Sequence, residues 1–382
     1  MASRLDASKL TISLTGSPQT IPAISNVSTK DHSDHILTVS WTAKNGWSSP
    51  RITPYTNLSL PPTANALHYA TACFEGMKLY RGFDGKLRLF RPLENCQRLL
   101  DSATRISLPA FEPEELQKLI SELCRVDGPR WLPRNTSKGS CLYIRPTMIG
   151  IDADLGFHVP QEALLYVILT YWPTSTTIKP LRLSANTEQW VRAWPGGSGN
   201  TKLAANYGPA LIAHGEAKRK GFDQVLWLFG AEGRVTEAGS TNFFVLWKGK
   251  SGGTEMVTPS LDSGLILPGI TRRSVLELAR KRFFETKEWE LNGSMLLAKS
   301  LDVVERDFTV HDIVEAAEEG RLLGAFAVGT AAFVNSVSQI DALGRTIHVD
   351  IDAVPYAALL HGWLSNIMYG LEPSDWTQVV EE

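Results

Sequence analysis

The sequence predicts an α+β protein with two domains, and three observations lead to this prediction. The chain has 382 residues, and at about 150 residues per domain this length favours two or three domains. Stretches with strand-like alternation and stretches with helical spacing of apolar residues lack a strict strand–helix–strand order, which indicates mainly antiparallel or mixed sheets. A stretch rich in Pro, Ser and Thr at residues 173–187 predicts the connection between the domains.

These observations divide the chain into four parts. Residues 1–30 are polar and are expected to form a flexible N-terminal segment. Residues 31–173 are expected to form the smaller domain, residues 174–188 the linker, and residues 189–382 the larger domain.

The smaller domain is expected to contain a hairpin, two helices and further strands. Asp84-Gly85 lies between two alternating runs within residues 77–90, which is a strong hairpin signal. Pro113 and the two glutamates after it suit the first turn of a helix. The helices are predicted at residues 93–106 and 113–126, and the strands at 37–41, 141–148 and 163–171.

In the larger domain, a glycine-rich turn at residues 195–199 is expected to lead into a helix from about residue 203 to 220. The remaining predicted elements are strands at 224–229, 242–247 and 255–259, and helices at 271–284, 311–319 and 354–369.

Composition and charge exclude several classes of protein. The net charge is −2 and the densest basic clusters fall within one predicted amphipathic helix, so we predict no nucleic-acid binding. The longest apolar run has ten residues, at 163–172, which is half of the about 20 that a membrane span needs. The four cysteines form no CxxC pair and no zinc-ligand spacing, so we predict neither a disulfide scaffold nor a metal site.

The location of the protein is predicted from the same features. Few cysteines in a long chain favour a reducing compartment, and we predict a cytoplasmic protein. Residues 1–30 are rich in Ser and Thr and nearly free of acidic residues, which weakly resembles a transit peptide and leaves a mitochondrial location open.

The segment from Gly196 to Pro209 carries the main chemical signal. Its glycine-rich turn presents Lys202 at the start of the predicted helix. The positive end of a helix and burial both lower the pKa of a lysine, which favours the neutral amine of Schiff-base chemistry. Tyr207 follows five residues later and can hydrogen-bond a pyridoxal ring oxygen. From spacing alone, a surface lysine beside a flexible loop is the commoner outcome.

Three later segments offer further polar groups. Glu237, just before the strand at 242–247, can pair with a pyridinium nitrogen or can be an ordinary turn carboxylate. Ile270 and Thr271 stand at a helix start, where backbone N–H groups bind anions, although threonine is also a common N-cap. Thr330 lies in another turn of small residues.

Together these residues resemble the branched-chain aminotransferases, which are class IV enzymes that depend on pyridoxal 5′-phosphate (PLP). The resemblance runs from about residue 34 to 370. Its motifs are Ala66-Leu67-His68-Tyr69 with Phe74-Glu75-Gly76-Met77-Lys78, Tyr143-Ile144-Arg145-Pro146, residues 196–209, Thr236-Glu237-Ala238-Gly239 and Leu267-Pro268-Gly269. It implies the two-domain class IV fold, similar to D-amino-acid aminotransferase, with PLP in the larger domain.

The resemblance also implies individual roles. Lys202 holds the cofactor as a Schiff base, Tyr207 contacts the phenolic oxygen and Glu237 contacts the ring nitrogen. The implied phosphate contacts are Arg98, Ile270, Thr271 and Thr330. The implied substrate contacts are Tyr69, Phe74, Tyr143 and Arg145 around the side chain, with Ser240 and Ala331 at the α-carboxylate. A homodimer is implied, in which Tyr69 and the loop around Leu155 reach the neighbouring active site.

Arg145 and Tyr143 are expected to accept the side-chain carboxylate of glutamate by charge-assisted hydrogen bonds. Without the resemblance, Arg145 would be assigned to an inter-strand salt bridge. The implied reaction moves the α-amino group of leucine, isoleucine or valine to 2-oxoglutarate with ping-pong kinetics. Its partners are therefore small amino acids and 2-oxo acids.

The sequence departs from the family pattern at four places. Ala204-Ala205 replace a pair of glycines, whose tight backbone the added methyl groups are expected to crowd. Ser240 replaces a threonine, and residues 171–175 lack the expected Gly-x-Tyr, so a pocket tyrosine is missing or moved. Residues 332–335 hold no cysteine pair, so we predict no thiol switch there.

These departures leave alternatives open. One is the same chemistry on an unusual amino acid in a specialised pathway. Others are D-amino-acid aminotransferase, amine transaminase and aminodeoxychorismate lyase, which share the fold, and a catalytically silent PLP-binding protein.

Overall fold

The computed structural model describes residues 2–22, 28–136, 139–172, 179–185, 189–250, 252–291 and 293–382. The chain forms two compact units. Unit 1 comprises Met1–Ser175, Thr201–Ala205 and Asn366–Glu382, and unit 2 comprises Thr176–Asn200 and Asn206–Ser365. The division therefore differs from the predicted one, because two later segments return to unit 1.

The predicted linker, residues 174–188, lies largely outside the described residues. Its described part, residues 179–185, contains strand β10 (Leu181–Ser184) of the sheet in unit 2. The predicted domain boundaries otherwise stay a prediction.

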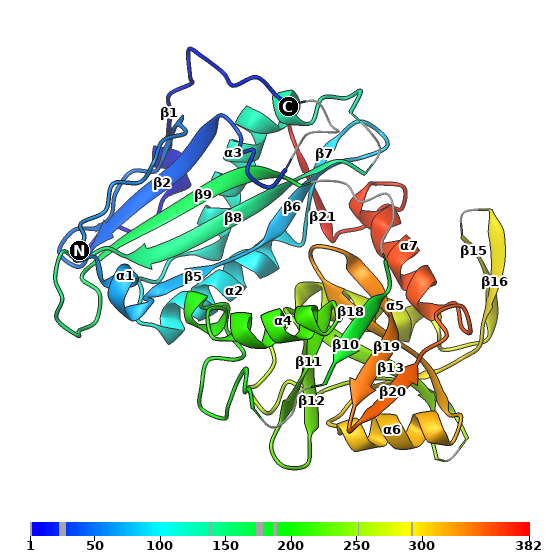
Figure 1. The fold of residues 1–382 in the computed structure, drawn as a ribbon. Coiled ribbons are helices and arrows are strands. Elements are labelled where there is room, and N and C mark those ends of the chain that lie inside the picture. The colour runs from blue at the N-terminus through cyan, green and yellow to red at the C-terminus, as the bar shows by residue number, and fades with distance from the viewer. Residues whose placement is uncertain are drawn as a thin grey trace. The chain divides into compact units, whose positions relative to one another are not determined.

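Unit 1 is built on a sheet of ten strands that is antiparallel except for one pair (Figure 1). The order is β1 (Thr11–Ile12), β4 (Arg51–Pro54), β2 (His35–Thr42), β9 (Glu162–Trp172), β8 (Cys141–Gly150), β6 (Met77–Arg81), β7 (Leu87–Phe90) and β21 (Thr377–Val380), with β3 (Gly46–Trp47) on β2 and β5 (Ala72–Phe74) on β8. The predicted hairpin is confirmed as β6 and β7.

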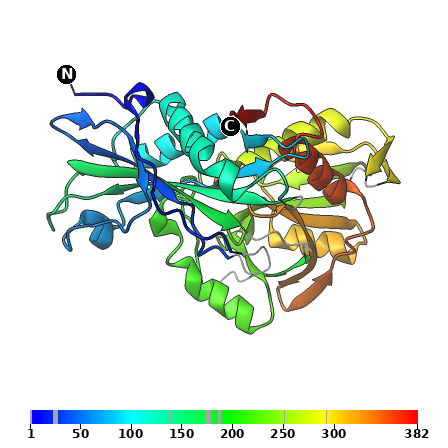
Figure 2. The same ribbon diagram turned by 90° about the horizontal axis from the view of Figure 1, so that it is seen from above.

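One face of this sheet is covered by α2 (Pro92–Arg105) and α3 (Pro113–Trp131), which lie along the same side of the sheet in Figure 2. Alternate residues of β9 are buried, as a strand with one covered face requires. Leu165 and Val167 of β9 share the core with Leu99 of α2 and Leu119 of α3. The opposite face of the sheet carries Tyr143 and Arg145.

Unit 2 contains a sheet of nine strands whose central six close into a ring. The ring runs β12 (Arg234–Ala238), β11 (Gln224–Phe229), β10, β19 (Phe333–Ala342), β18 (Leu322–Gly329) and β13 (Thr241–Lys248), and then back to β12. The strands β14 (Thr254–Thr258), β17 (Asp302–Glu305) and β20 (Arg345–His348) extend it. β15 (Lys287–Leu291) and β16 (Ser294–Ala298) form a separate hairpin.

Four α-helices of the described residues lie in the second half of the chain. They are α4 (Ala210–Arg219), α5 (Ile270–Arg282), α6 (Val310–Glu318) and α7 (Tyr356–Met368). Three were predicted close to these bounds, but the helix expected from residue 203 was wrong at its start. Residues Ala204–Asn206 form only a short 3-10 turn, and α4 begins after Pro209. The residue before a proline is disfavoured in the helical conformation, so Gly208-Pro209 separates the two.

The N-terminal segment makes defined contacts over residues 2–22. It contains the short helix η1 (Ala7–Lys9) and strand β1, which pairs with β4, and Leu5 belongs to the core of unit 1. None of the helices in the described part of the chain is both long and apolar enough to cross a membrane.

Candidate active site

Lys202 is held in unit 1 by its own main chain. Its carbonyl oxygen accepts a hydrogen bond from the N–H group of Phe74 at 3.1 Å, and its N–H group donates to Ser102 Oγ at 2.9 Å. Leu203 forms an isolated β-bridge with Cys73. The segment is therefore anchored to β5 on one side and to α2 on the other, and the interpretation as a surface lysine beside a flexible loop is wrong.

The surroundings of Lys202 favour its neutral form. Its ammonium nitrogen lies 4.9 Å from the ring centroid of Phe74. Burial lowers the pKa of Lys202, the nearby charge of Arg98 lowers it further, and Glu75 opposes both. Of the two predicted causes, burial is confirmed, whereas the helix N-terminus does not apply, because α4 begins eight residues later. The neutral form of the amine is the nucleophile and the base that Schiff-base chemistry requires.

Arg98 of α2 forms a bidentate ion pair with Glu75, a residue to which the sequence analysis gave no role. The distances are 2.6 Å from Nε to Oε1 and 2.9 Å from Nη2 to Oε2, and both side chains are buried. Glu75 also accepts the N–H group of Gly76 at 3.0 Å. An acidic residue between two apolar strands was the available signal, because a buried carboxylate requires a cationic partner.

Tyr143 and Arg145 of β8 point to the same face of the sheet, opposite Thr170 and Ile168 of β9. The guanidinium carbon of Arg145 lies 4.6 Å from the Phe74 ring centroid and 5.1 Å from that of Tyr143. Its Nε is buried and has no hydrogen-bond partner within the described residues. The structure gives Arg145 no ion pair there, so the salt-bridge alternative is wrong for the described chain.

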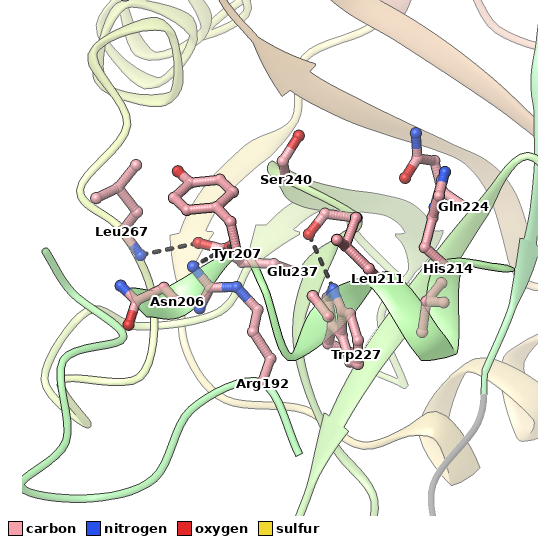
Figure 3. A pocket seen from close by; sticks show the side chains of 13 residues that line it. Arg192, Asn206, Tyr207, Leu211, His214, Gln224, Trp227, Glu237, Ser240 and Leu267 are labelled. Carbon is pink, nitrogen blue, oxygen red and sulfur yellow. Dashed lines mark hydrogen bonds and ion pairs between the residues drawn. The ribbon is translucent and has the colours of Figure 1, made fainter. Parts of the chain in front are cut away.

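Unit 2 holds a cavity of about 260 Å³ that brings together three of the predicted site residues, Tyr207, Glu237 and Ser240 (Figure 3). Its wall is formed by α4, β11, the end of β12 and the segment before α5. The remaining lining residues are Arg192, Asn206, Ala210, Leu211, His214, Gln224, Val225, Trp227, Gly239 and Leu267.

Glu237 is the buried anion of this cavity. It lies in β12, only 2% exposed, so the solvated-turn alternative is wrong. Its Oε2 forms an ion pair with Arg192 Nη2 at 2.9 Å, and its Oε1 accepts the N–H group of Leu267 at 2.8 Å (Figure 3). Arg192 was missed in the sequence, since nothing in its neighbourhood links it to an acid 45 residues later.

The phosphate-site candidates Ile270 and Thr271 form the first turn of α5, whose N-cap is Gly269. Asn242, the cross-strand partner of Glu237, donates to the carbonyl of Leu267 at 2.9 Å. A Cβ on Gly269 would lie 2.0 Å from Asn242 Oδ1, so only glycine allows this approach. β12 and β13 together thus fix the start of α5, whose backbone N–H groups attract anions.

Two further sets of candidates lie elsewhere. Thr330 and Ala331 form the turn between β18 and β19, at the end of the sheet where Asn242 stands opposite Val328. Tyr69, in α1 (Asn65–Tyr69), instead packs edge-on against Phe157 and donates its hydroxyl to the carbonyl of Leu155.

Comparison with known proteins identifies the family. A family model described as amino-transferase class IV matches residues 72–337. The cytosolic branched-chain-amino-acid aminotransferase of Saccharomyces cerevisiae is 43% identical over 99% of this chain and 98% of its own length.

The chain belongs to the class IV aminotransferases.

Other proteins that this chain resembles are named as branched-chain aminotransferases. The mitochondrial branched-chain-amino-acid aminotransferase of Schizosaccharomyces pombe is 40% identical over 91% of this chain and 78% of its own length. The branched-chain amino acid aminotransferase from Thermobaculum terrenum, solved in its PLP form, shares the fold: it is 22% identical, covers 92% of this chain and 100% of that chain, and gives a TM-score of 0.67. The predicted family and fold class are thereby confirmed.

Class IV aminotransferases use PLP, and the side chains of this protein fit it. A buried carboxylate such as Glu237 suits a protonated ring nitrogen, because a nearby negative charge favours the cationic form. The start of α5 suits a phosphate. Lys202 offers an amine whose pKa is lowered.

Proposed function

We propose that this aminotransferase moves the α-amino group of L-leucine, L-isoleucine or L-valine to 2-oxoglutarate. The relatives' names support the branched-chain substrates. The observation that carries the acidic co-substrate is the buried Nε of Arg145, which lacks a partner in the described chain. An unpaired buried donor is costly, and a side-chain carboxylate would satisfy it.

The surface formed by Arg145, Phe74 and Tyr143 can also accept an apolar substrate side chain. Arg145 lies over the rings of Phe74 and Tyr143, and such cation–π contacts partly stabilise the guanidinium when no carboxylate is present. An aliphatic side chain can then pack on the aromatic rings, whereas glutamate adds charge-assisted hydrogen bonds to Arg145 and Tyr143. One pocket thus serves both substrates.

We assign the cofactor contacts as the resemblance implies. Lys202 would hold PLP, Tyr207 would bind its phenolic oxygen, Glu237 would bind its ring nitrogen, and Ile270, Thr271, Thr330 and Arg98 would hold its phosphate. When bound, PLP supplies an electron sink for the substrate Cα. Glu237 would stabilise the protonated ring nitrogen, and its ion pair with Arg192 holds the carboxylate in place.

Lys202 is the proton carrier of the proposed reaction. Its neutral amine removes the Cα proton of the bound amino acid and returns it later as an ammonium. Ser240 and Ala331 bind the α-carboxylate, so that the Cα–H bond stays oriented toward the amine. Phe74 and Tyr143 keep water from the apolar side chain of the substrate.

A substrate panel tests this function. Purified holoenzyme is assayed with L-leucine, L-isoleucine, L-valine, their D-enantiomers and simple amines, each with 2-oxoglutarate, and glutamate is measured. We expect turnover of the three L-amino acids and parallel lines when both substrates are varied. Intersecting lines would exclude the ping-pong scheme. Turnover of D-amino acids or amines instead, or PLP binding without turnover, would favour the corresponding alternative.

A homodimer is also proposed. Leu67, Tyr69, Leu155, Phe157 and Val159 are exposed apolar residues of unit 1, and Tyr69 contacts both Phe157 and Leu155. Exposed apolar residues that gather on a surface are typical of protein interfaces, and the resemblance assigns Tyr69 and the Leu155 loop to a neighbouring active site. Cytosolic and mitochondrial relatives both occur, and the cytoplasmic location stays a proposal.

A further inference from the structure

The hydroxyl group of Tyr143 occupies a place that Gly76 leaves open. Gly76 follows β5 and precedes β6. A Cβ atom on Gly76 would lie 1.9 Å from Tyr143 Oη and 2.7 Å from Cζ. Protein interiors are close-packed, so any side chain at position 76 excludes the hydroxyl from its present position. The phenol is the end of a rigid ring and cannot bend away by itself.

Trp172 restrains the same ring from its face. The two ring centroids are 4.9 Å apart, with an interplanar angle of 29°. Cys141 stands opposite Trp172 and Tyr143 opposite Thr170, so Trp172 and Tyr143 are diagonal neighbours on one face, within reach of aromatic side chains. Trp172 lies where this chain departs from the family pattern, and it stacks there on the residue proposed to receive a carboxylate.

Two cationic side chains lie near the stacked rings of Tyr143 and Trp172. The guanidinium of Arg145 lies 5.1 Å from the Tyr143 centroid, and the ammonium of Lys78 lies 5.7 Å from the Trp172 centroid. The buried Nε of Arg145 has no partner in the described chain. A phenol fixed beside an unsatisfied guanidinium donor forms a two-donor site for a carboxylate, and hydrogen bonds weaken steeply when the donor is misplaced.

We infer that Gly76 and Trp172 are positioning residues that set the Tyr143 hydroxyl and thereby determine how well the enzyme accepts a dicarboxylic co-substrate. This inference rests on the proposed function. An aliphatic substrate makes no hydrogen bond to the phenol, so displacing the hydroxyl penalises 2-oxoglutarate and glutamate more than leucine.

The test compares two half-reactions of the holoenzyme. L-Leucine is added to the PLP form, and 2-oxoglutarate to the pyridoxamine-phosphate form, and the half-saturating concentration of each is measured by absorption. We expect Gly76→Ala to raise the half-saturating concentration of 2-oxoglutarate about tenfold, which is the effect of losing one hydrogen bond to a charged group. The half-saturating concentration of leucine should change far less. Gly16→Ala is the matched control, because a Cβ there meets nothing within 4 Å.

Two further variants keep the test decisive if Gly76→Ala does not fold. Trp172→Leu removes the stacked ring and keeps an apolar side chain, and it should shift the preference in the same direction. Tyr143→Phe removes the hydroxyl itself. Each of Gly76→Ala and Trp172→Leu is also combined with Tyr143→Phe. If Gly76 and Trp172 act through that hydroxyl, each double variant should have a half-saturating concentration of 2-oxoglutarate little above that of its worse single variant.

The outcomes separate the inference from the proposed function. Additive effects, or equal losses for leucine and 2-oxoglutarate, would overturn the inference and indicate a general structural role. Variants that match the wild type would overturn it as well. A PLP-loaded wild-type enzyme that does not react with 2-oxoglutarate at all would overturn the proposed function, which the wild-type half-reactions reveal before any variant is made.

Discussion

At the scale of single residues, Glu75 and Arg98 illustrate how a buried charge is made tolerable. Glu75 is fully buried and Arg98 nearly so, and hydrogen bonds from Arg98 and from the Gly76 N–H group replace those that water would donate to the carboxylate. Removing one partner leaves the other charge buried and uncompensated. We expect Glu75→Gln to lower the free energy of unfolding by about 3–5 kcal/mol in chemical denaturation. Glu122→Gln, which breaks the exposed pair with Arg125, is the control and should cost under about 1 kcal/mol; equal losses would contradict the account.

Lys202 carries a prediction on pH. Burial and Arg98 lower its pKa below 10.5, so the amine loses its proton at a lower pH than an exposed lysine and its reactivity rises earlier as pH increases. In the cofactor-free protein, reductive labelling by a small aldehyde should reach half its plateau at Lys202 at a lower pH than for a free lysine derivative added to the same reaction, as mass spectrometry would show. Labelling of Lys202 and of the free derivative over the same pH range would contradict the assigned environment.

Some residues of the candidate site could be predicted from the sequence and others could not. Lys202, Tyr207 and Glu237 were assigned because a family pattern joins weak local signals. Arg192 carries no local pattern, and the position of Glu75 between two apolar strands indicates only that its carboxylate needs a cationic partner. The tertiary contacts identify Glu237 as the partner of Arg192 and Arg98 as the partner of Glu75.

At the scale of elements, the segment after Lys202 is where sequence reasoning failed most clearly. A continuous helix from residue 203 was expected, and Gly208-Pro209 prevents it. Ala204 and Ala205 were expected to crowd a tight backbone, yet neither is among the described residues with positive φ. The alanines therefore fit a backbone that does not require glycine.

This geometry predicts the effect of restoring the glycine pair. Glycine costs about 0.5–1 kcal/mol relative to alanine where the conformation is helical, because its unfolded chain has more freedom to lose. We expect Ala204→Gly with Ala205→Gly to lower the free energy of unfolding by about 1–2 kcal/mol without raising kcat/KM for leucine. A gain in kcat/KM would show that the methyl groups do obstruct the site.

The burial pattern explains why β9 was predicted from the sequence and β18 was not. β9 alternates buried and half-buried residues over its length, and its apolar sequence was assigned correctly. β18, with the sequence Leu-Leu-Gly-Ala-Phe-Ala-Val-Gly, is buried on both faces over most of its length, and such continuous apolar runs do not distinguish a strand from a buried helix. The ring closure between β12 and β13 depends on pairing that no local signal encodes.

At the scale of the whole molecule, the C-terminal residues return to unit 1. β21 pairs with β7, and Glu382 forms a 2.5 Å ion pair with buried Arg81. We expect removal of residues 375–382 to expose the edge of β7 and leave Arg81 without this carboxylate, lowering Tm by several degrees in calorimetry, at about 2–4 °C per kcal/mol for a domain of this size. Glu382→Gln should produce a smaller part of the same loss. An unchanged Tm on truncation would show that β21 adds nothing to unit 1.

The four cysteines give a second prediction at this scale. All are buried and unpaired as disulfides, and burial raises the pKa of Cys73 to about 12. A protonated, buried thiol is a poor nucleophile. We therefore expect thiol alkylation or mild peroxide to leave the activity of the native enzyme intact, with labelling of Cys73 only after unfolding. Rapid inactivation that thiols reverse would contradict this.

The most direct test of the central claim, that Lys202 carries PLP in an aminotransferase, is the near-visible absorption spectrum of the purified protein before and after L-leucine is added. The account predicts a band of lysine-bound PLP that fades as a pyridoxamine-phosphate band rises, and no such bound band in Lys202→Ala. A wild-type protein that shows no band even after incubation with PLP, or a Lys202→Ala protein that behaves like the wild type, would contradict it.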